Sequence, residues 1–371
     1  MNALFISNDP QIFSAESAVR ARMRSYAALM DELHIVGVAR AGAEYTEEGN
    51  LFLYPIAVSK IMRIPILART ARAVIRARRI HIVSAQDPFE HGFAALLASF
   101  RTGVKRHIQI HTDFLSPYFA RESLMNRFRI VCAALTLRTA HGIRVVSGRI
   151  QNALLHRYET DIVSVSVIPV ALPEDAPPVS LPPNAFMFSL LAVSRLEREK
   201  HIEDILSALI LVGRKYPNIG LFIAGSGSKE KDIQKRVSAL GLSGNVIFLG
   251  SRTDARGLMK SAQAFVQASA HEGYGLTLIE AALAGTAIAS TDVGVIGNVL
   301  MPEVDVLASE PENPEALAAN IFRLIENNTL RLSLSEHAKK AAETHVARFK
   351  NQPELVVADL EGTLSRHIAV I

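Results

Sequence analysis

Residues 264–285, AFVQASAHEGYGLTLIEAALAG, contain the pattern of a strand, a glycine-bearing loop and a helix in direct succession. The apolar run 264–267 is typical of a buried strand, and a helical pattern follows from about Gly275 or Leu276. Gly285 suits the end of that helix, because glycine adopts the left-handed conformation at little cost. The stretch therefore predicts a βα unit, whose helix start offers free N–H groups and a positive dipole end to a phosphate.

Two carboxylates stand at defined places in this unit. Glu272 falls in the loop and Glu280 in the second turn of the helix, so both can face one crevice. A carboxylate accepts two hydrogen bonds from vicinal hydroxyls, which sugars and ribose offer. Gly273 and Gly275 allow the backbone to approach a ligand closely. The alternative interpretation is a charged loop followed by an ordinary helix.

Similar apolar runs alternate with amphipathic segments along all 371 residues. This alternation predicts βαβ units with parallel sheets, and the length favours two domains. The expected strands are 3–7, 34–38, 80–84, 107–110, 142–146, 163–168, 186–193, 220–223, 246–249, 264–267 and 287–290. Six prolines between Pro169 and Pro183 mark a linker, because proline fixes φ and removes a ladder donor. The chain is thus expected to be an α/β protein with two doubly wound domains, at 1–170 and 171–354.

Two further segments could serve an anionic ligand. Arg195 and Lys200 follow the first strand of the second domain, where they could neutralise a diphosphate as it leaves. A charged loop that opens a helix is the simpler explanation of that segment. The run 221–230, LFIAGSGSKE, resembles a dinucleotide fingerprint, but Glu230 stands where the third glycine belongs. An NAD site is therefore weakly supported, and a tight turn near a nucleotide is sufficient to explain Gly225 and Gly227.

Composition excludes several classes of protein. With 49% hydrophobic and 20% charged residues, the chain can form a large core. The single cysteine, Cys132, excludes an internal disulfide and is expected to be a buried structural thiol in a reducing compartment. Residues 1–9 are expected to form a first strand rather than a signal peptide. No stretch approaches about 18 uninterrupted apolar residues, so no membrane span is expected.

Charge is distributed unevenly along the chain. Residues 1–170 carry 21 Lys/Arg against 13 Asp/Glu, a net +8, and the remainder carries −4. The basic half should meet an anionic partner. A helix is predicted from Pro65, with Arg69, Arg72, Arg76 and Arg79 on one face, which is typical of a membrane-surface helix or of a solvated face. Nucleic acid is the weakest choice of partner, because aromatic residues make up only 6% and no reading motif is present.

The order of these segments resembles bacterial GT-B retaining glycosyltransferases of glycosyltransferase family 4. The family's Glu-x7-Glu pattern corresponds to Glu272 and Glu280, its Arg/Lys pair to Arg195 and Lys200, and its glycine turn to 224–227. The run 245–250, NVIFLG, is similar to the strand that leads to the base pocket. In the first half, 108–113, IQIHTD, looks like the family's strand ending in a site histidine, here His111. Two departures concern the acceptor side: 8–11 is NDPQ where a Gly-Gly loop is common, and 169–171 is PVA where the family has Pro-Asn-Gly.

The resemblance implies a fold and an activity. The fold would be GT-B, two Rossmann-like domains facing a central cleft, with the first on the acceptor side, the second binding the nucleotide sugar, and a C-terminal helix at about 355–371 packing back on the first. The activity would be transfer of a hexose-type sugar from a UDP- or GDP-sugar to a glycan or lipid-linked acceptor in cell-surface polysaccharide synthesis. Such enzymes need no metal or other cofactor. The expected location is the cytoplasm, with peripheral contact between the basic domain and the anionic inner membrane face.

The resemblance also implies roles for residues. Glu272, His111, Arg195 and Lys200 would form the catalytic set, with the first two at the transferred sugar and the last two at the diphosphate. The donor would be held by Glu280 on the ribose hydroxyls and by Gly225, Gly227, Gly275, Leu276 and Thr277. Alternatives with the same fold are a sugar-nucleotide epimerase, a phosphorylase, which would need a pyridoxal lysine and usually a longer chain, and a non-catalytic nucleotide-sugar-binding subunit.

Overall fold

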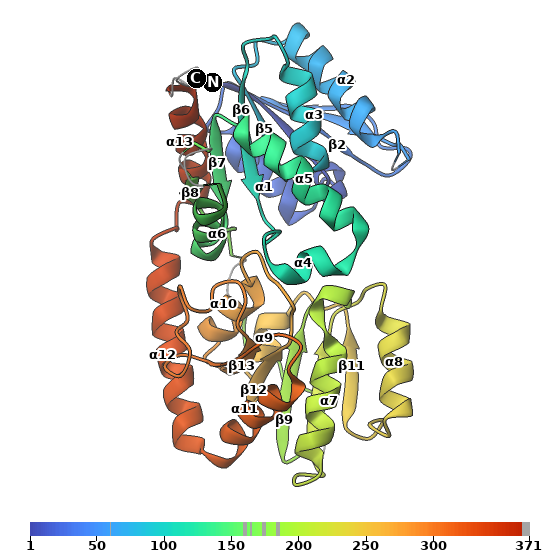
Figure 1. Ribbon diagram of the computed structural model, residues 1–371, viewed down its shortest axis with the longest axis vertical. Coiled ribbons are helices and arrows are strands. Elements are labelled where there is room, and N and C mark those ends of the chain that lie inside the picture. Colours follow the sequence, from blue (N-terminus) through green and yellow to red (C-terminus); the bar gives the residue numbers. More distant parts are fainter. Residues whose placement is uncertain (60, 159–161, 164, 173–175, 183–185, 366–371) are drawn as a thin grey trace. The chain divides into compact units, whose positions relative to one another are not determined.

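The computed structural model describes residues 1–371 except 60, 159–161, 164, 173–175, 183–185 and 366–371 (Figure 1). It divides the chain into two compact units, Met1–Pro169 with Asn351–Ile371, and Val170–Lys350. Pro173 and Pro183 of the predicted linker, Ser164 of a predicted strand and the end of the predicted C-terminal helix lie outside the described residues.

The first unit is built on an eight-stranded sheet with the order β3-β4-β2-β1-β5-β6-β7-β8. Neighbouring strands are parallel except for β3 and β4. Its strands are β1 Asn2–Ser7, β2 Glu32–Val38, β3 Thr46–Glu48, β4 Leu51–Ile56, β5 Ile82–Ala85, β6 Lys105–Ile110, β7 Gly142–Val145 and β8 Val165–Val167. Its helices are η1 Pro10–Phe13, α1 Ala18–Ala27, α2 Arg63–Ala77, α3 Glu90–Ser99, α4 Pro117–Glu122, α5 Leu124–Arg138, α6 Gly148–Tyr158 and α13 Gln352–Ser365.

Helix α13 completes the first unit although it ends the described chain. Val356, Val357 and Leu360 belong to the same buried cluster as Phe5 and Ile35 of the central strands. The helix thus lies against the sheet with α1, while α2 and α3 contact the strands from the other side. The amphipathic face of α13 is buried by residues at the opposite end of the chain.

The second unit is built on a six-stranded parallel sheet with the order β11-β10-β9-β12-β13-β14. Its strands are β9 Phe188–Val193, β10 Ile219–Ala224, β11 Val246–Gly250, β12 Ala264–Gln267, β13 Ala287–Thr291 and β14 Leu307–Ser309. Its helices are η2 Arg198–Lys200, α7 Ile202–Gly213, α8 Glu230–Ala239, α9 Ala255–Met259, α10 Leu276–Leu283, α11 Pro314–Glu326 and α12 Asn328–Ala347. The strand order reverses between β9 and β12, and ligands of open α/β sheets bind beyond the carboxyl ends of the strands at such a point.

The predicted α/β class with two parallel sheets is confirmed, and three short strands were missed. Strand β4, LFLYPI, contains Pro55, a residue that is rare inside strands because proline cannot donate to a ladder. Strand β3 pairs only with residues 51–53 of β4, so Pro55 lies where β4 forms the edge of the sheet. Strands β3 and β14 have three residues each, too few for an apolar period to be recognised.

Two predictions for the first unit need correction. The arginine-bearing helix α2 ends at Ala77, so Arg79 lies beyond it, and Arg72 donates to the carbonyls of Leu97 and Phe100 at the end of α3 instead of facing solvent freely. Arg69 and Arg76 are exposed as expected. Cys132 of α5 is half-buried rather than fully buried, and burial together with the Glu90 charge raises the pKa of its thiol.

Candidate functional site

The loop after β12 and the start of α10 have the predicted form. Gly275 has a φ of 84° and precedes the first turn of α10, which begins at Leu276. A side chain at position 275 would meet both a strained backbone and the Leu278 side chain, because a Cβ atom there would lie 2.9 Å from Leu278 Cδ1. No side chain caps the helix, and the N–H groups of Leu276 and Thr277 have no acceptor among the described residues. The helix start is therefore open to an anion.

Lys200 and Glu272 form a direct ion pair. The Lys200 Nζ atom lies 2.6 Å from Glu272 Oε1, and the two side chains are only 12% and 15% exposed. The Ser269 hydroxyl donates to the same carboxylate oxygen at 2.8 Å. A backbone bond from the Ala270 N–H to the Glu199 carbonyl, 2.9 Å, fastens the two loops together. Glu272 Oε2 accepts no hydrogen bond within the described part of the chain, so one carboxylate oxygen is anchored and the other is open.

The pair lies at the reversal of strand order in the second sheet. Lys200 ends η2, which follows β9, and Glu272 follows β12, the neighbouring strand. His201, next to Lys200, adopts a left-handed conformation with φ 46°, which sets the turn into α7. The sequence predicted the two residues separately, with Lys200 at a diphosphate and Glu272 at a sugar, and did not predict that they bond to each other.

Glu280 lies half-buried on α10, in surroundings that disfavour its ionised form. Its carboxylate has no hydrogen bond or ion pair within the described ranges, and burial raises the pKa of Glu280, an effect that the Arg256 charge partly offsets. An ionised carboxylate without donors is costly in such a place. Hydroxyl donors from a ligand would relieve that cost, so the geometry is compatible with the predicted ribose contact.

The glycine turn after β10 is required by close packing of backbones. A Cβ atom at Gly225 would lie 1.8 Å from the Ser194 carbonyl oxygen, and one at Gly227 would lie 2.4 Å from the Leu196 carbonyl oxygen. The Leu196 N–H donates to the Ser226 carbonyl at 2.9 Å, which holds the two loops at this spacing. Gly225 and Gly227 therefore shape the site by packing one loop against another, a reason that the sequence did not reveal.

A cavity of about 270 Å³ opens where the glycine turn after β10 meets the loop after β9. It is lined by Val193, Ser194, Arg195, Ala224, Gly225, Ser226, Ser251, Arg252 and Thr277, from the carboxyl ends of three strands and the start of α10. Arg195 is 73% exposed at its rim and pairs with Glu199 at 3.0 Å. Arg252 is likewise paired, with Asp254, its Nε atom lying 2.8 Å from Asp254 Oδ1. The uncapped helix start is the feature of the cavity that favours an anion.

Two polar side chains near this cavity were not predicted. Within the described parts of the chain, the buried Ser194 hydroxyl has no hydrogen-bond partner. Nor does the buried Nε2 atom of Gln267, whose Oε1 atom accepts from the Thr277 hydroxyl at 2.9 Å. Buried polar atoms are usually satisfied, so these two are candidates for ligand contacts. Their positions in the sequence, at the carboxyl ends of β9 and β12, could have identified them, because ligands bind at the carboxyl ends of parallel strands.

His111 follows β6 in the first unit. Burial of the ring and the charges of Arg144 and Arg22 lower the pKa of His111 to about 3, so the imidazole is neutral at physiological pH. Its Nε2 atom is buried and lacks a hydrogen-bond partner among the residues that the structure describes. Arg144, one of these two charges, is fully buried, and its bond of 2.7 Å to the Gln109 side chain fixes its position. His111 is thus an unpaired neutral group suited to hydrogen bonding.

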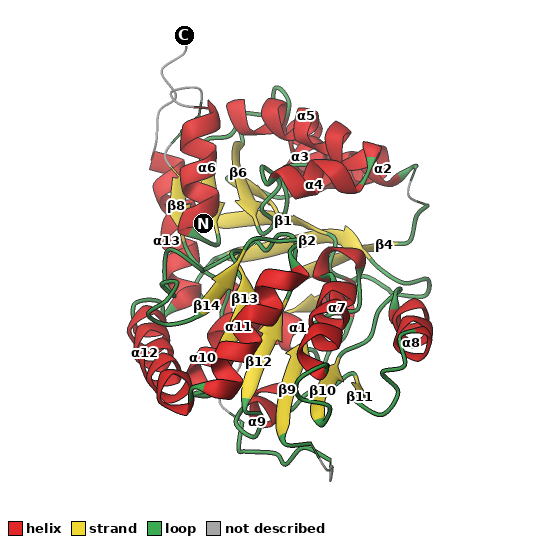
Figure 2. Ribbon diagram, turned by 60° about the horizontal axis from the view of Figure 1, so that its bottom comes forward, coloured by secondary structure: helices red, strands yellow, loops and turns green. Residues whose placement is uncertain are grey.

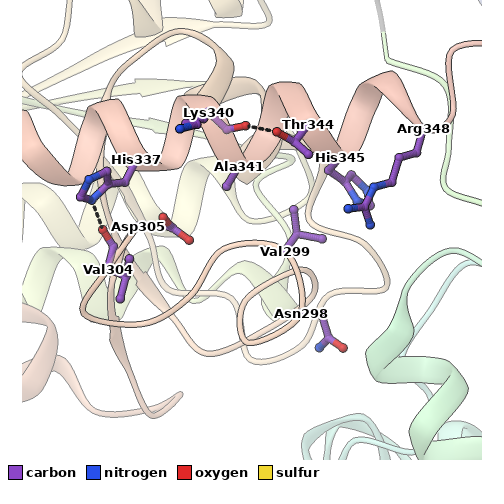
Figure 3. A pocket seen from close by; sticks show the side chains of 10 residues that line it. All are labelled: Asn298, Val299, Val304, Asp305, His337, Lys340, Ala341, Thr344, His345 and Arg348. Carbon is purple, nitrogen blue, oxygen red and sulfur yellow. Dashed lines mark hydrogen bonds between the residues drawn. The ribbon is translucent and has the colours of Figure 1, made fainter.

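A larger hollow of about 400 Å³ lies elsewhere in the second unit, between the loop 298–305 and α12 (Figure 3). Its lining residues are Asn298, Val299, Val304, Asp305, His337, Lys340, Ala341, Thr344, His345 and Arg348. None of the predicted site residues lines it. A hydrogen bond of 3.1 Å between His345 and the Tyr274 hydroxyl connects its wall to the Glu272 loop.

Known protein families match both units. Residues 186–341 match the family Glycosyl transferases group 1, and residues 15–174 match Glycosyltransferase Family 4. Among curated proteins, an uncharacterised glycosyltransferase of Methanocaldococcus jannaschii is 31% identical over 153 residues, 41% of this chain and 39% of that protein. The lipopolysaccharide core biosynthesis glycosyltransferase LpsE of Rhizobium meliloti is 25% identical over 191 residues, 52% of this chain and 51% of LpsE. The chain thus spans about half or less of the length of these relatives.

Solved structures share the fold at low sequence identity. A sucrose-phosphate synthase from Thermosynechococcus elongatus has a TM-score of 0.78 at 18% identity, covering 98% of this chain and 99% of that one. Anabaena Alr3699/HepE, in complex with UDP and glucose, has a TM-score of 0.71 at 18% identity, covering 98% of this chain and all of the other. These likenesses confirm the expected GT-B fold.

Proposed function

We propose that this chain, whose two units match Glycosyl transferases group 1 and Glycosyltransferase Family 4, moves a hexose-type sugar from a UDP- or GDP-sugar to a glycan or lipid-linked acceptor, with retention of anomeric configuration. The observation that carries the proposal is the largely buried ion pair between Lys200 and Glu272, at the point where the strand order of the second sheet reverses. Glu272 lies in the loop that leads to the open start of α10. A cation, a carboxylate and free backbone N–H groups are what a nucleotide sugar requires.

The diphosphate is proposed to lie at the start of α10. As the bond between the anomeric carbon and the diphosphate oxygen breaks, the electron pair stays on that oxygen. Lys200, Arg195 and the N–H groups of Leu276 and Thr277 would stabilise the developing charge. Lys200 is nearly excluded from solvent, which strengthens its effect, whereas Arg195 would have to leave Glu199 to reach the ligand.

The sugar and ribose are proposed to meet the two carboxylates. Glu272 Oε1 is held by Lys200 and Ser269, so the free Oε2 atom would accept from a sugar hydroxyl. Glu280, which has no donor of its own, would accept from the ribose hydroxyls. His111 is retained as a catalytic residue on the resemblance alone, and its low pKa limits it to hydrogen bonding as a neutral imidazole.

The acceptor hydroxyl is proposed to attack on the face that the diphosphate leaves, and its proton would pass to the departing diphosphate oxygen. The positive side chains take the place of a metal ion in this scheme, so transfer should persist in excess EDTA. The acceptor is proposed to belong to cell-surface polysaccharide synthesis, as the name of LpsE suggests for that relative. The cytoplasm and the inner membrane face, reached through the basic residues 1–170, are the proposed location. Among the described residues, no helix has both the length and the apolarity that crossing a membrane requires.

The direct test is a ligand panel on the purified full chain. Thermal shifts with UDP, GDP and their sugars would identify the nucleotide, and UDP comes first because Anabaena Alr3699/HepE and a pneumococcal transferase were solved with it. Mass spectrometry with candidate acceptors would then identify the product. Conversion of the nucleotide sugar without acceptor would indicate an epimerase. Tight nucleotide-sugar binding without any turnover would indicate a non-catalytic subunit, and no shift with any nucleotide would contradict the donor site.

A further inference from the structure

Helix α5 exposes a row of large apolar side chains to solvent. Leu124, Phe128, Val131 and Leu135 are 79%, 60%, 68% and 49% exposed. Their spacing of four, three and four residues places them on one narrow stripe of the helix. Single exposed apolar residues are ordinary on protein surfaces, but a contiguous stripe of this kind marks a binding surface.

The opposite side of α5 explains why the stripe is not needed for folding. The buried residues of α5 are Asn126, Ala133, Thr136 and Leu137, of which only Leu137 is a large apolar residue. Asn126 donates to the Phe119 carbonyl at 3.0 Å, and the Thr136 hydroxyl donates to the Pro88 carbonyl at 2.6 Å. The helix is therefore held by these polar contacts and by the buried Leu137 and Ala133, and its apolar stripe remains exposed.

Positive charge surrounds the stripe. Arg127 and Arg138 are exposed on α5 itself. Helix α3 packs between α5 and α2, so the three helices form one layer (Figure 2). Together they contain seven arginines and a single acid, Glu90, whose carboxylate is paired with Arg129 at 2.7 Å. The layer thus carries many more positive than negative side chains.

We propose that α5 is a membrane-docking helix that inserts the Leu124–Phe128–Val131–Leu135 stripe into the interface of an anionic bilayer. An interfacial helix combines an apolar stripe with basic flanks, and Arg127 and Arg138 would lie at the level of lipid phosphates. A second copy of the chain fits less well, because a symmetric contact would bring the same arginine-rich layer against itself. This inference refines the proposed function by placing a lipid-linked acceptor near the first unit, but it needs no transfer activity to be tested.

The single cysteine provides a test on the native sequence. Cys132 is adjacent to Val131 at the rim of the stripe and is half-buried. An environment-sensitive fluorophore on Cys132 should shift to the blue with vesicles of phosphatidylglycerol and phosphatidylcholine and should be quenched by lipids carrying a bromine in the chain. A control chain with Cys132→Ser and Leu332→Cys, labelled on an exposed position of α12, should show neither change.

Vesicle sedimentation of unlabelled variants gives an independent measure. The double change Phe128→Ser and Val131→Ser should weaken partitioning by about tenfold or more, because each side chain loses its apolar burial. Arg127→Gln and Arg138→Gln should each weaken it about fivefold at low salt, the equivalent of about 1 kcal/mol per charge near the surface. The matched control Leu332→Ser, also an exposed leucine at 58%, should bind as the parent does.

Outcomes that overturn the proposal are distinct from failure of the proposed function. No fluorescence change on anionic vesicles, or equal sedimentation of the Phe128→Ser/Val131→Ser and Leu332→Ser variants, would reject it. So would a dimer in analytical ultracentrifugation that separates on Phe128→Ser without any vesicle binding. Nucleotide thermal shifts are recorded on the same preparations without vesicles, so loss of membrane binding and loss of donor binding are read separately.

Discussion

Lys200 and Glu272 are 72 residues apart in the sequence, and their ion pair joins two loops. Removing either side chain would leave the other without its oppositely charged partner. We predict that Lys200→Met and Glu272→Gln each lower the transfer rate by about 10²–10³, the usual loss when a preorganised charge is removed from a transition state. Rates measured at saturating donor, together with donor affinity, check this prediction. Lys215→Met is the control, because Lys215 makes a comparable pair with Glu326 on the surface, at 2.7 Å and 62% exposure. Near-normal transfer by both site variants would contradict the assigned roles.

Glu280 is expected to reduce the stability of the free protein at neutral pH, although it is proposed to bind the ligand. Burial raises the pKa of Glu280, so the folded protein holds this proton more tightly than the unfolded chain, whose carboxyl titrates near 4.5. The contribution of Glu280 to stability is therefore full below about pH 4.5 and is lost as pH rises through the folded pKa.

We predict that Glu280→Gln raises the melting temperature at pH 7.5, leaves it nearly unchanged near pH 4, and weakens nucleotide-sugar binding. Differential scanning fluorimetry at the two pH values, with and without nucleotide, measures all three effects. A variant that melted earlier at pH 7.5 would show that the carboxylate has a stabilising partner, contrary to this interpretation.

At the scale of elements, the turn between β10 and α8 is fixed by backbone contact with the loop after β9. We predict that Gly225→Ala lowers the free energy of unfolding by several kcal/mol, because its Cβ would overlap the Ser194 carbonyl and its φ of 143° is unsuited to a side chain. Urea unfolding measures the change. Gly244→Ala is the matched control, because a Cβ there meets no atom within 4 Å, and it should change stability little. Equal destabilisation of both variants would refute the packing explanation.

Sequence patterns predicted elements better than the contacts between them. The order strand, loop and helix in 264–285 followed from local residues, and α10 begins and ends where glycines indicated. The bond between Lys200 and Glu272 could not be predicted, because it depends on β9 and β12 being neighbours in the sheet. Helix α5 shows a further limit: its pattern contains apolar residues on the exposed side, and periodicity alone does not tell which side faces the core.

At the scale of the whole molecule, the first unit is assembled from both ends of the chain. Asp359 of α13 accepts hydrogen bonds from His107 Nε2 at 2.9 Å and from the Ser166 hydroxyl at 2.6 Å. Gly142 of β7 is needed beside it, because a Cβ atom there would lie 2.0 Å from the Thr363 hydroxyl. Composition marked the boundary near the prolines, but partners separated by 252 and 193 residues cannot be inferred from local patterns.

This assembly predicts that damage to α13 affects the first unit selectively. Asp359→Ala should remove about 1–3 kcal/mol, because it leaves the buried His107 and the half-buried Ser166 hydroxyl without their acceptor. In calorimetry a lower-temperature transition should separate from the main one, while UDP still shifts the upper transition, since the proposed donor site lies within Val170–Lys350. Glu361→Ala, an exposed change on the same helix, is the control and should leave the trace unchanged. If Asp359→Ala instead lowered one undivided transition and abolished the UDP shift, then the two units would unfold as one and the donor site would depend on α13.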